Sequence, residues 1–335
     1  MSPRTNRAWL AWLTMLAIGL VAGVLFWAYY RVTTAKFPLV FLNPQLMVFA
    51  LSGLAFGLLS ARRRPTSSWL LELLLAGGLV VFSLATLLFK DASVHFLFFS
   101  LYYAFPAPTR SFQILSGHVL AFLFSPVPFF ILARRYTAVV ADDKESIPAL
   151  WLGAGAGFVI AYFLLPLVGA YILLFAACVP IFFFLDRKTI AIGGALLLVA
   201  GGFLMAHPPT AFYTWQLREY KHIDSFWTPF YKLDYITYDD DHCLAAVHNT
   251  AFVWAVCDGP ERQLLMYKRI AQVLAEEDNP PQRMLNIGRV NGTFPLSVRI
   301  NNPHIQRLLA VEYDPYMTKD VAGRYAKYND YLYAD

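Results

Sequence analysis

Two short apolar runs in the last third of the chain each lead directly into residues that could bind a nucleoside. Residues 283–287 are followed by a loop that holds Gly288 and Gly292, and residues 308–311 are followed by Glu312. In a strand–helix–strand unit, a loop glycine lets the backbone approach a nucleotide, and a carboxylate after the next strand accepts hydrogen bonds from ribose hydroxyls. Glu312 follows Gly288 by 24 residues, close to the ~20 usual for such units, although the loop has two glycines where three are usual. The pattern predicts a nucleoside-binding edge.

The segment before these runs alternates apolar and polar residues with a period of two, as strands with one buried face do. Turn residues interrupt the alternation at 239–241 and at 249–250. Helices are predicted for residues 261–276 and 295–300, the second with Pro295 in its first turn. The predicted strands are residues 231–238, 243–248, 251–257, 283–288 and 308–312. We therefore expect a small α/β domain with N-terminal β-hairpins and one βαβ unit.

Two of the three cysteines, Cys243 and Cys257, are symmetric about Thr250. If the hairpin turns at Thr250, the two face each other across the ladder, where Cβ atoms lie ~4.5–5.5 Å apart, near the approach that a disulfide needs. Two interpretations stay open: a disulfide, which persists outside the cytosol, or two buried thiols. Because cysteines are few and the aspartates at 239–241 lack EF-hand spacing, no metal site is expected.

The first 206 residues consist mainly of apolar runs suited to crossing a lipid bilayer. A helix that rises ~1.5 Å per residue needs ~20 apolar residues to cross ~30 Å of hydrocarbon. Seven stretches are close to this length and predict an all-α membrane domain of about seven transmembrane helices. The stretches are residues 8–30, 39–60, 69–89, 112–132, 149–166, 170–185 and 189–205.

A short aromatic run, from Val94 to Phe105, decides whether an eighth span is expected. Its length of 12 residues favours an interfacial or re-entrant segment. With seven spans, four Lys/Arg clusters fall on one side of the membrane, whereas an eighth span at this run would divide them. The clusters lie at residues 4–7, 62–64, 134–135 and 187–188. We therefore predict a protein of the plasma or bacterial inner membrane, with a cytoplasmic N-terminus and an extracytoplasmic C-terminal domain.

Few polar residues interrupt the predicted spans. Glu72 lies in the first turn of a span and is expected to reach towards the interface, while His118 is expected to hydrogen-bond a neighbouring helix. Glycines predict close helix packing at positions 153, 155, 157, 193, 194, 201 and 202. No repeated set of charges favours a channel or a carrier.

Composition and charge separate the two parts of the chain. It contains 58% hydrophobic and 15% charged residues with a mean hydropathy of +0.49, against roughly 25% charged residues in soluble domains. Residues 1–206 carry a net charge of +8 and residues 207–335 a net charge of −3, so the basic pI comes from the loops of the membrane domain. Nucleic acid is therefore not an expected partner. Residues 207–226, which are rich in aromatics, predict an interfacial linker to a soluble domain at 227–335.

Three motifs between Ser225 and Asp314 resemble spermidine synthase, the polyamine aminopropyltransferase family, whose membrane-anchored members carry several spans before this domain. Residues 227–236 (Trp-Thr-Pro-Phe-Tyr-Lys-Leu-Asp-Tyr-Ile) resemble the family's opening strand. Residues 285–292 (Leu-Asn-Ile-Gly-Arg-Val-Asn-Gly) resemble its glycine-rich nucleotide loop, and residues 311–314 (Val-Glu-Tyr-Asp) resemble its Val-Glu-Ile-Asp segment.

The resemblance implies a methyltransferase-like, Rossmann-type fold for this part of the chain and decarboxylated S-adenosylmethionine as its cofactor. Glu312 would hold the ribose, and Tyr267 falls where the family carries the Tyr-His-Glu of its substrate site. The residues that the resemblance assigns to the cofactor are Gly288, Asn291, Gly292, Glu312 and Asp314.

The chain departs from the family at positions that matter for chemistry. Lys268 and Arg269 stand where the family has His-Glu, and two cations would repel a polyamine. Asn291 replaces the loop aspartate. The family's catalytic aspartate lies in a later strand, and the sequence ends at Asp335, so no catalytic residue is assigned.

Two functions fit these observations. The favoured one is a non-catalytic membrane protein whose incomplete spermidine-synthase-like domain packs on other membrane-protein subunits. The alternative is a membrane-bound aminopropyltransferase, seen without its catalytic C-terminal half, that uses decarboxylated S-adenosylmethionine. In both interpretations the first partner of the chain is the lipid bilayer.

Overall fold

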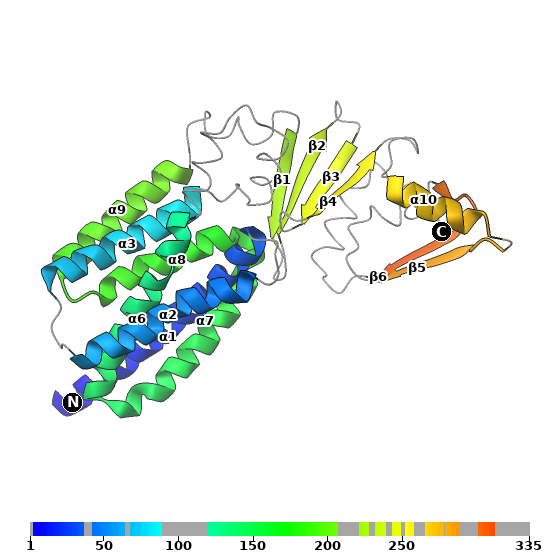
Figure 1. Cartoon of the computed structure of the whole chain (residues 1–335). Helices are drawn as coiled ribbons and strands as arrows, with labels where there is room; N and C mark the ends of the chain where they lie inside the picture. The colour runs from blue at the N-terminus through cyan, green and yellow to red at the C-terminus, as the bar shows by residue number, and fades with distance from the viewer. Residues whose placement is uncertain are drawn as a thin grey trace. The chain divides into compact units, whose positions relative to one another are not determined.

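The computed structural model of the chain divides into two compact units, Met1–Tyr213 and Thr214–Asp335 (Figure 1). The division falls within the predicted linker at residues 207–226. The structure describes residues 3–36, 42–63, 68–88, 119–206, 221–227, 232–238, 243–248, 252–257, 265–277, 279–287 and 301–311. Most of these residues are helical.

The first unit is a bundle of apolar helices. Its described helices are α1 (Pro3–Lys36), α2 (Leu42–Arg63), α3 (Trp69–Leu88), α6 (Pro126–Asp142), α7 (Ile147–Val168), α8 (Ala170–Ile181) and α9 (Lys188–Ala206). Four helical stretches are long and apolar enough to cross a membrane, namely Ala8–Thr34, Trp69–Leu87, Val119–Asp142 and Lys144–Val168. The shorter apolar helices are Pro44–Ser60, Ala170–Phe184 and Lys188–Phe203. The predicted all-α membrane domain is therefore confirmed at the level of several membrane-capable helices.

Helices α1 and α7 pack with their backbones in close approach. A Cβ atom added at Gly19 would lie well under 3.0 Å from the carbonyl oxygen of Leu150, and one added at Gly23 would lie equally close to that of Ala154. Gly157 meets α1 in the same way. Because the contacts advance together along both helices, α1 and α7 run parallel. Glycines four residues apart are the feature that lets membrane helices approach this closely.

Helices α2 and α6 repeat this arrangement. A Cβ atom at Gly53 would collide with the carbonyl group of Pro126, and one at Gly57 would lie 2.6 Å from the carbonyl oxygen of Phe130. These two helices are therefore also parallel. Both contacts need a glycine because a backbone carbonyl, unlike a long side chain, has no room to move aside.

Helix α9 uses glycine to admit aromatic rings. Gly194 faces the ring of Phe182, in the 3-10 turn η2 (Phe182–Phe184), and Gly202 faces the ring of Phe175 in α8. The contacts advance in opposite directions, so α8 and α9 are antiparallel. The prediction of close packing is confirmed at Gly153, Gly157, Gly194, Gly201 and Gly202. It is wrong at Gly155 and Gly193, where an added Cβ atom would meet no described residue within 4 Å.

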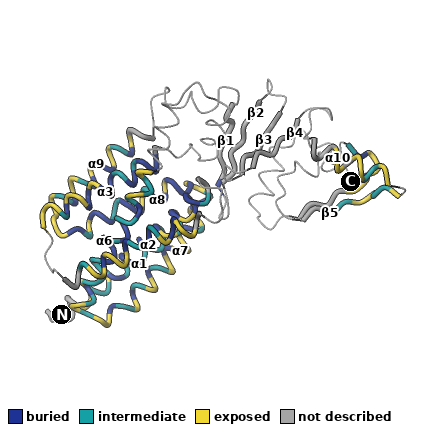
Figure 2. Tube along the Cα trace, in the orientation of Figure 1, coloured by how far each residue is buried: buried dark blue, intermediate teal, exposed yellow. Residues whose placement is uncertain are grey.

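The outer faces of the bundle are apolar. Leu167 is 78% exposed, Trp151 72% and Phe203 71%. Figure 2 shows buried residues along the inner sides of the helices and exposed residues along the outer sides. Large apolar faces of this kind are stable in hydrocarbon and not in water, which agrees with an integral membrane protein.

The second unit contains two described sheets. Strands β1 (Lys221–Trp227), β2 (Lys232–Tyr238), β3 (Cys243–His248) and β4 (Phe252–Cys257) form an antiparallel sheet in the order β1-β2-β3-β4. Helix α10 (Leu265–Ala275) follows, and β5 (Arg283–Ile287) pairs in parallel with β6 (Arg307–Val311). The predicted strands β2 to β6 are confirmed. The predicted linker is wrong for residues 221–226, because β2 satisfies the backbone hydrogen bonds of β1 there.

The glycine contacts give a prediction with an internal control. Gly153→Ala should lower the stability of the bundle by about 1–3 kcal/mol, because the added methyl group must push α1 away from α7. Gly155→Ala, on the same helix, should be neutral or stabilising by about 0.5–1 kcal/mol, because it meets nothing and improves helix propensity. Unfolding of both variants in mixed detergent micelles measures the difference. Equal effects of the two substitutions would contradict this account of α1–α7 packing.

Candidate functional site

Strands β5 and β6 position the predicted nucleoside-binding edge. Their register pairs Arg283 with Arg307 at one end and Ile287 with Val311 at the other. In a parallel pair both strands end at the same edge, so Ile287 and Val311 lie side by side at their carboxyl ends. Ligands of open α/β sheets bind at this edge.

A small core holds these strands to helix α10. Ile305 is buried and packs against Leu274 of α10 and Met284 of β5. The carbonyl oxygen of Gln282 accepts hydrogen bonds from the backbone N–H groups of Gln306 (2.8 Å) and of residue 307 (3.2 Å). These bonds bring the beginnings of β5 and β6 together and so fix the register that places their ends.

The residues assigned to the cofactor by resemblance follow this edge in the sequence. Gly288, Asn291, Gly292, Glu312 and Asp314 lie outside the described residues. Tyr267 lies in α10, the helix that precedes β5, as its assignment to a substrate site requires. The structure therefore describes the strands that lead to the predicted site, and the roles of these residues stay predictions. His118 also lies outside the described residues. Within the described part of the chain, no group of His, Cys, Asp and Glu side chains could hold a metal ion.

The pairing of β3 with β4 aligns the two cysteines of the disulfide hypothesis. Strand β3 pairs with β4 so that Cys243 lies directly opposite Cys257, and His248 opposite Phe252 at the turn end. Residues directly opposite each other in an antiparallel ladder have Cα atoms about 4.5–5.5 Å apart, within the range that a disulfide spans. The backbone thus meets the geometric condition for a bond between them, and the bond itself stays a prediction. Cys178 is a free, buried thiol in α8.

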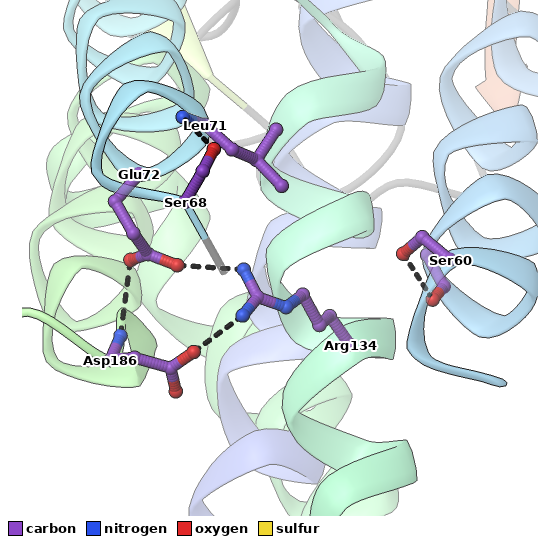
Figure 3. A network of polar contacts seen from close by, with 7 residues as sticks. Ser60, Ser68, Leu71, Glu72, Arg134 and Asp186 are labelled. Atoms are coloured by element: carbon purple, nitrogen blue, oxygen red, sulfur yellow. Dashed lines mark hydrogen bonds and ion pairs between the residues drawn. The ribbon is translucent and has the colours of Figure 1, made fainter. Parts of the chain in front are cut away.

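A second polar centre lies at one end of the helical bundle, around Arg134 of α6 (Figure 3). One guanidinium nitrogen of Arg134 donates to Oε1 of Glu72 at 2.7 Å, and another donates to Oδ2 of Asp186. The backbone N–H of Asp186 donates to the other carboxylate oxygen of Glu72 at 3.1 Å. Arg134 therefore joins the start of α3 to the segment before α9.

Burial makes the ion pairs of this centre important for the stability of the bundle. The side chain of Glu72 is fully buried and that of Arg134 is 14% exposed, whereas that of Asp186 is 47% exposed. A buried carboxylate is stable only when its charge is compensated and its oxygens are hydrogen-bonded. The expectation that the Glu72 side chain reaches out towards the interface is therefore wrong, because this side chain turns into the bundle and bonds to Arg134.

From the sequence alone, Arg134 is expected only to belong to one of the Lys/Arg clusters that set the orientation in the membrane. The signal that pointed to its role is the pair of opposite charges, Glu72 and Arg134, each placed inside a membrane-capable helix. Charged residues in such helices are found in pairs because an isolated charge is costly there. The sequence offered several cations for Glu72, and only the packing of α3 on α6 selects one.

No protein-family model, curated protein or solved structure matches this chain. The resemblance to spermidine synthase therefore rests on the motifs of residues 227–314 alone.

The ion pairs give a stability prediction. Arg134→Gln should destabilise the bundle by about 3 kcal/mol, near the lower end for breaking a buried pair, because Glu72 then stays buried without its cation. Combining it with Glu72→Gln should restore part of this loss, because both charges are gone. Lys144→Gln, an exposed cation in the turn after α6, is the matched control. Detergent unfolding curves measure all three variants, and an Arg134→Gln protein as stable as the control would refute the role of the pair.

The cysteine register gives a chemical prediction. In intact cells, a membrane-impermeant maleimide should label neither Cys243 nor Cys257 until a reductant is added, and should then label both. Cys178→Ala removes the third thiol, so that every label counted belongs to β3 or β4. Peptide mass mapping measures the two labels. Labelling without reductant would contradict the disulfide, and labelling only after cell lysis would contradict the extracytoplasmic placement.

Proposed function

We propose that this chain is a seven-span membrane protein that carries a spermidine-synthase-like domain, binds an adenosyl nucleoside there, and acts as a non-catalytic membrane subunit. The observation that carries the proposal is the parallel register in which Ile287 lies beside Val311. The next residues in sequence are Gly288 and Glu312, the glycine and carboxylate that a nucleoside site uses at this edge.

The charges of α10 support binding without transfer to a polyamine. Lys268 and Arg269 occupy the positions where the resembled family has a histidine and a carboxylate. Arg269 is exposed on α10. A polyamine carries several positive charges, and two further cations at its site repel it.

The directions of the helices support seven spans. Glu72, at the start of α3, bonds to Arg134. Gly78, one and a half turns further along α3, faces Phe124 and Val127, which come before Arg134 in the sequence. Helices α3 and α6 are therefore antiparallel. Because α3 and α6 cross the membrane in opposite directions, the segment between them crosses it either not at all or an even number of times. This favours the interfacial or re-entrant interpretation of the run from Val94 to Phe105.

The same directions support the proposed orientation. The end of the bundle that holds Arg134 also holds Arg63 at the end of α2 and Lys188 at the start of α9. Helix α9 begins at this end and runs away from it, and the second unit follows α9 in the sequence. Because Lys and Arg concentrate in cytoplasmic loops, this supports a cytoplasmic basic end and an extracytoplasmic soluble domain.

A second candidate is aminopropyl transfer from decarboxylated S-adenosylmethionine to an amine. The parallel register of β5 and β6 supports it as well, because the same nucleoside site is needed. Transfer is a displacement at carbon by an amine freed of its proton, so it also needs a base near that amine. The two candidates therefore differ in whether an amine substrate binds and reacts, and both need the same nucleoside site.

Equilibrium dialysis of the full chain in detergent with labelled decarboxylated S-adenosylmethionine tests the shared site. We expect saturable binding that Glu312→Ala weakens about 10- to 100-fold, the range for losing hydrogen bonds to a charged group. Glu276→Ala, an exposed carboxylate after α10, should leave binding unchanged. Absence of saturable binding would remove the support for both candidates. Transfer of the labelled aminopropyl group to an added diamine would establish the second candidate and exclude the first.

A further inference from the structure

The neighbour of Arg134 in α6 is a cation in a different environment. The Nε atom of Arg135 is buried and has no hydrogen-bond partner, while the side chain as a whole is partly exposed. Long basic side chains bury their inner part against apolar neighbours and turn the outer nitrogens of the charged head to the membrane surface. Arg135 therefore presents a charge at the surface of the bundle.

The two carboxylates of the centre around Arg134 are already paired. Arg134 takes both Glu72 and Asp186, as Figure 3 shows. Among the residues that the structure describes, Arg135 has no ion pair. Arg187 and Lys188 directly follow Asp186, which Arg134 bonds, and both are exposed. Arg135, Arg187 and Lys188 thus lie at the end of the bundle where Arg134 pairs with both Glu72 and Asp186.

The same end of the bundle has the apolar surface that a lipid chain needs. Trp69, at the start of α3, is 57% exposed, and Leu73, one turn later on the same face, is 43% exposed. Trp side chains are typical of the level of lipid headgroups, and exposed leucines beyond them lie at the level of acyl chains. A ligand with an anionic head and an apolar tail fits both features.

We propose that Arg135, Arg187 and Lys188 bind the phosphate of an anionic phospholipid in the leaflet at this end of the bundle. The proposal rests on the membrane placement given above. An arginine donates several hydrogen bonds in a planar fork to phosphate oxygens, and the two neighbouring cations add charge. Basic sites between membrane helices recognise anionic headgroups in this way.

The test uses the full chain in a neutral detergent, with short-chain phosphatidylglycerol as the probe and phosphatidylcholine of the same chain length as the neutral reference. The rise of the thermal unfolding midpoint with lipid concentration gives an apparent Kd. Arg135→Gln and Arg187→Gln should each raise this Kd for phosphatidylglycerol about five-fold, the factor that matches ~1 kcal/mol per cation near a membrane surface. Arg187 is exposed, so its variant should retain the lipid-free midpoint of the wild type.

Lys144→Gln is the control, because Lys144 is an exposed cation flanked by Asp143 and Glu145. It should leave the Kd unchanged. The proposal is overturned if both arginine variants bind phosphatidylglycerol as the wild type does, or if Lys144→Gln weakens binding equally. Equal stabilisation by phosphatidylcholine or by inorganic phosphate would also overturn it, because the ligand would then be any lipid or any anion. Nucleoside binding reports on the other unit, so its failure is distinguishable from failure here.

Discussion

A charge inside a membrane bundle must find its counter-charge within the protein, and the ion pairs of Arg134 show how this chain meets that requirement. Glu72 and Arg134 are 62 residues apart in sequence, and Asp186 lies a further 52 residues on. Water cannot compensate Glu72, whose side chain is fully buried. Helix α3, helix α6 and the segment before α9 are therefore tied to one arrangement, and the basic end of the bundle follows from it.

Close contacts between helix backbones also hold the bundle together. In a bilayer, lipid tails are as apolar as leucine, so helices gain little from burying leucine against each other. Gly19 and Gly157 between α1 and α7, and Gly53 between α2 and α6, let the helices come close enough for contact along the backbone. Large apolar side chains fill the rest of the interior, as Phe82, Leu79 and Leu174 do, and also cover the outer faces. This division explains why a bundle with so many leucines places glycine at its tightest contacts.

The soluble unit follows the opposite rule, because its order comes from backbone pairing. The register of β5 with β6 brings the two strand ends together, and that of β3 with β4 brings Cys243 opposite Cys257. The register of β3 with β4 agrees with the symmetric spacing of the two cysteines about Thr250 in the sequence. Ion pairs, close backbone contacts and strand pairing thus order different parts of this chain.

The sequence by itself determined the properties that depend on neighbours along the chain. Apolar runs of about 20 residues predicted the helices of the bundle, period-two alternation predicted β2 to β4, and short apolar runs predicted β5 and β6, because hydropathy and side-chain alternation are local. It did not show that the Glu72 side chain turns inward to Arg134, and it did not distinguish Gly153, which meets α1, from Gly155, where an added Cβ atom meets no described residue within 4 Å. Only the tertiary structure decided these, because the rotation of each helix and the identity of its neighbour select which face, and which distant charge, a residue meets.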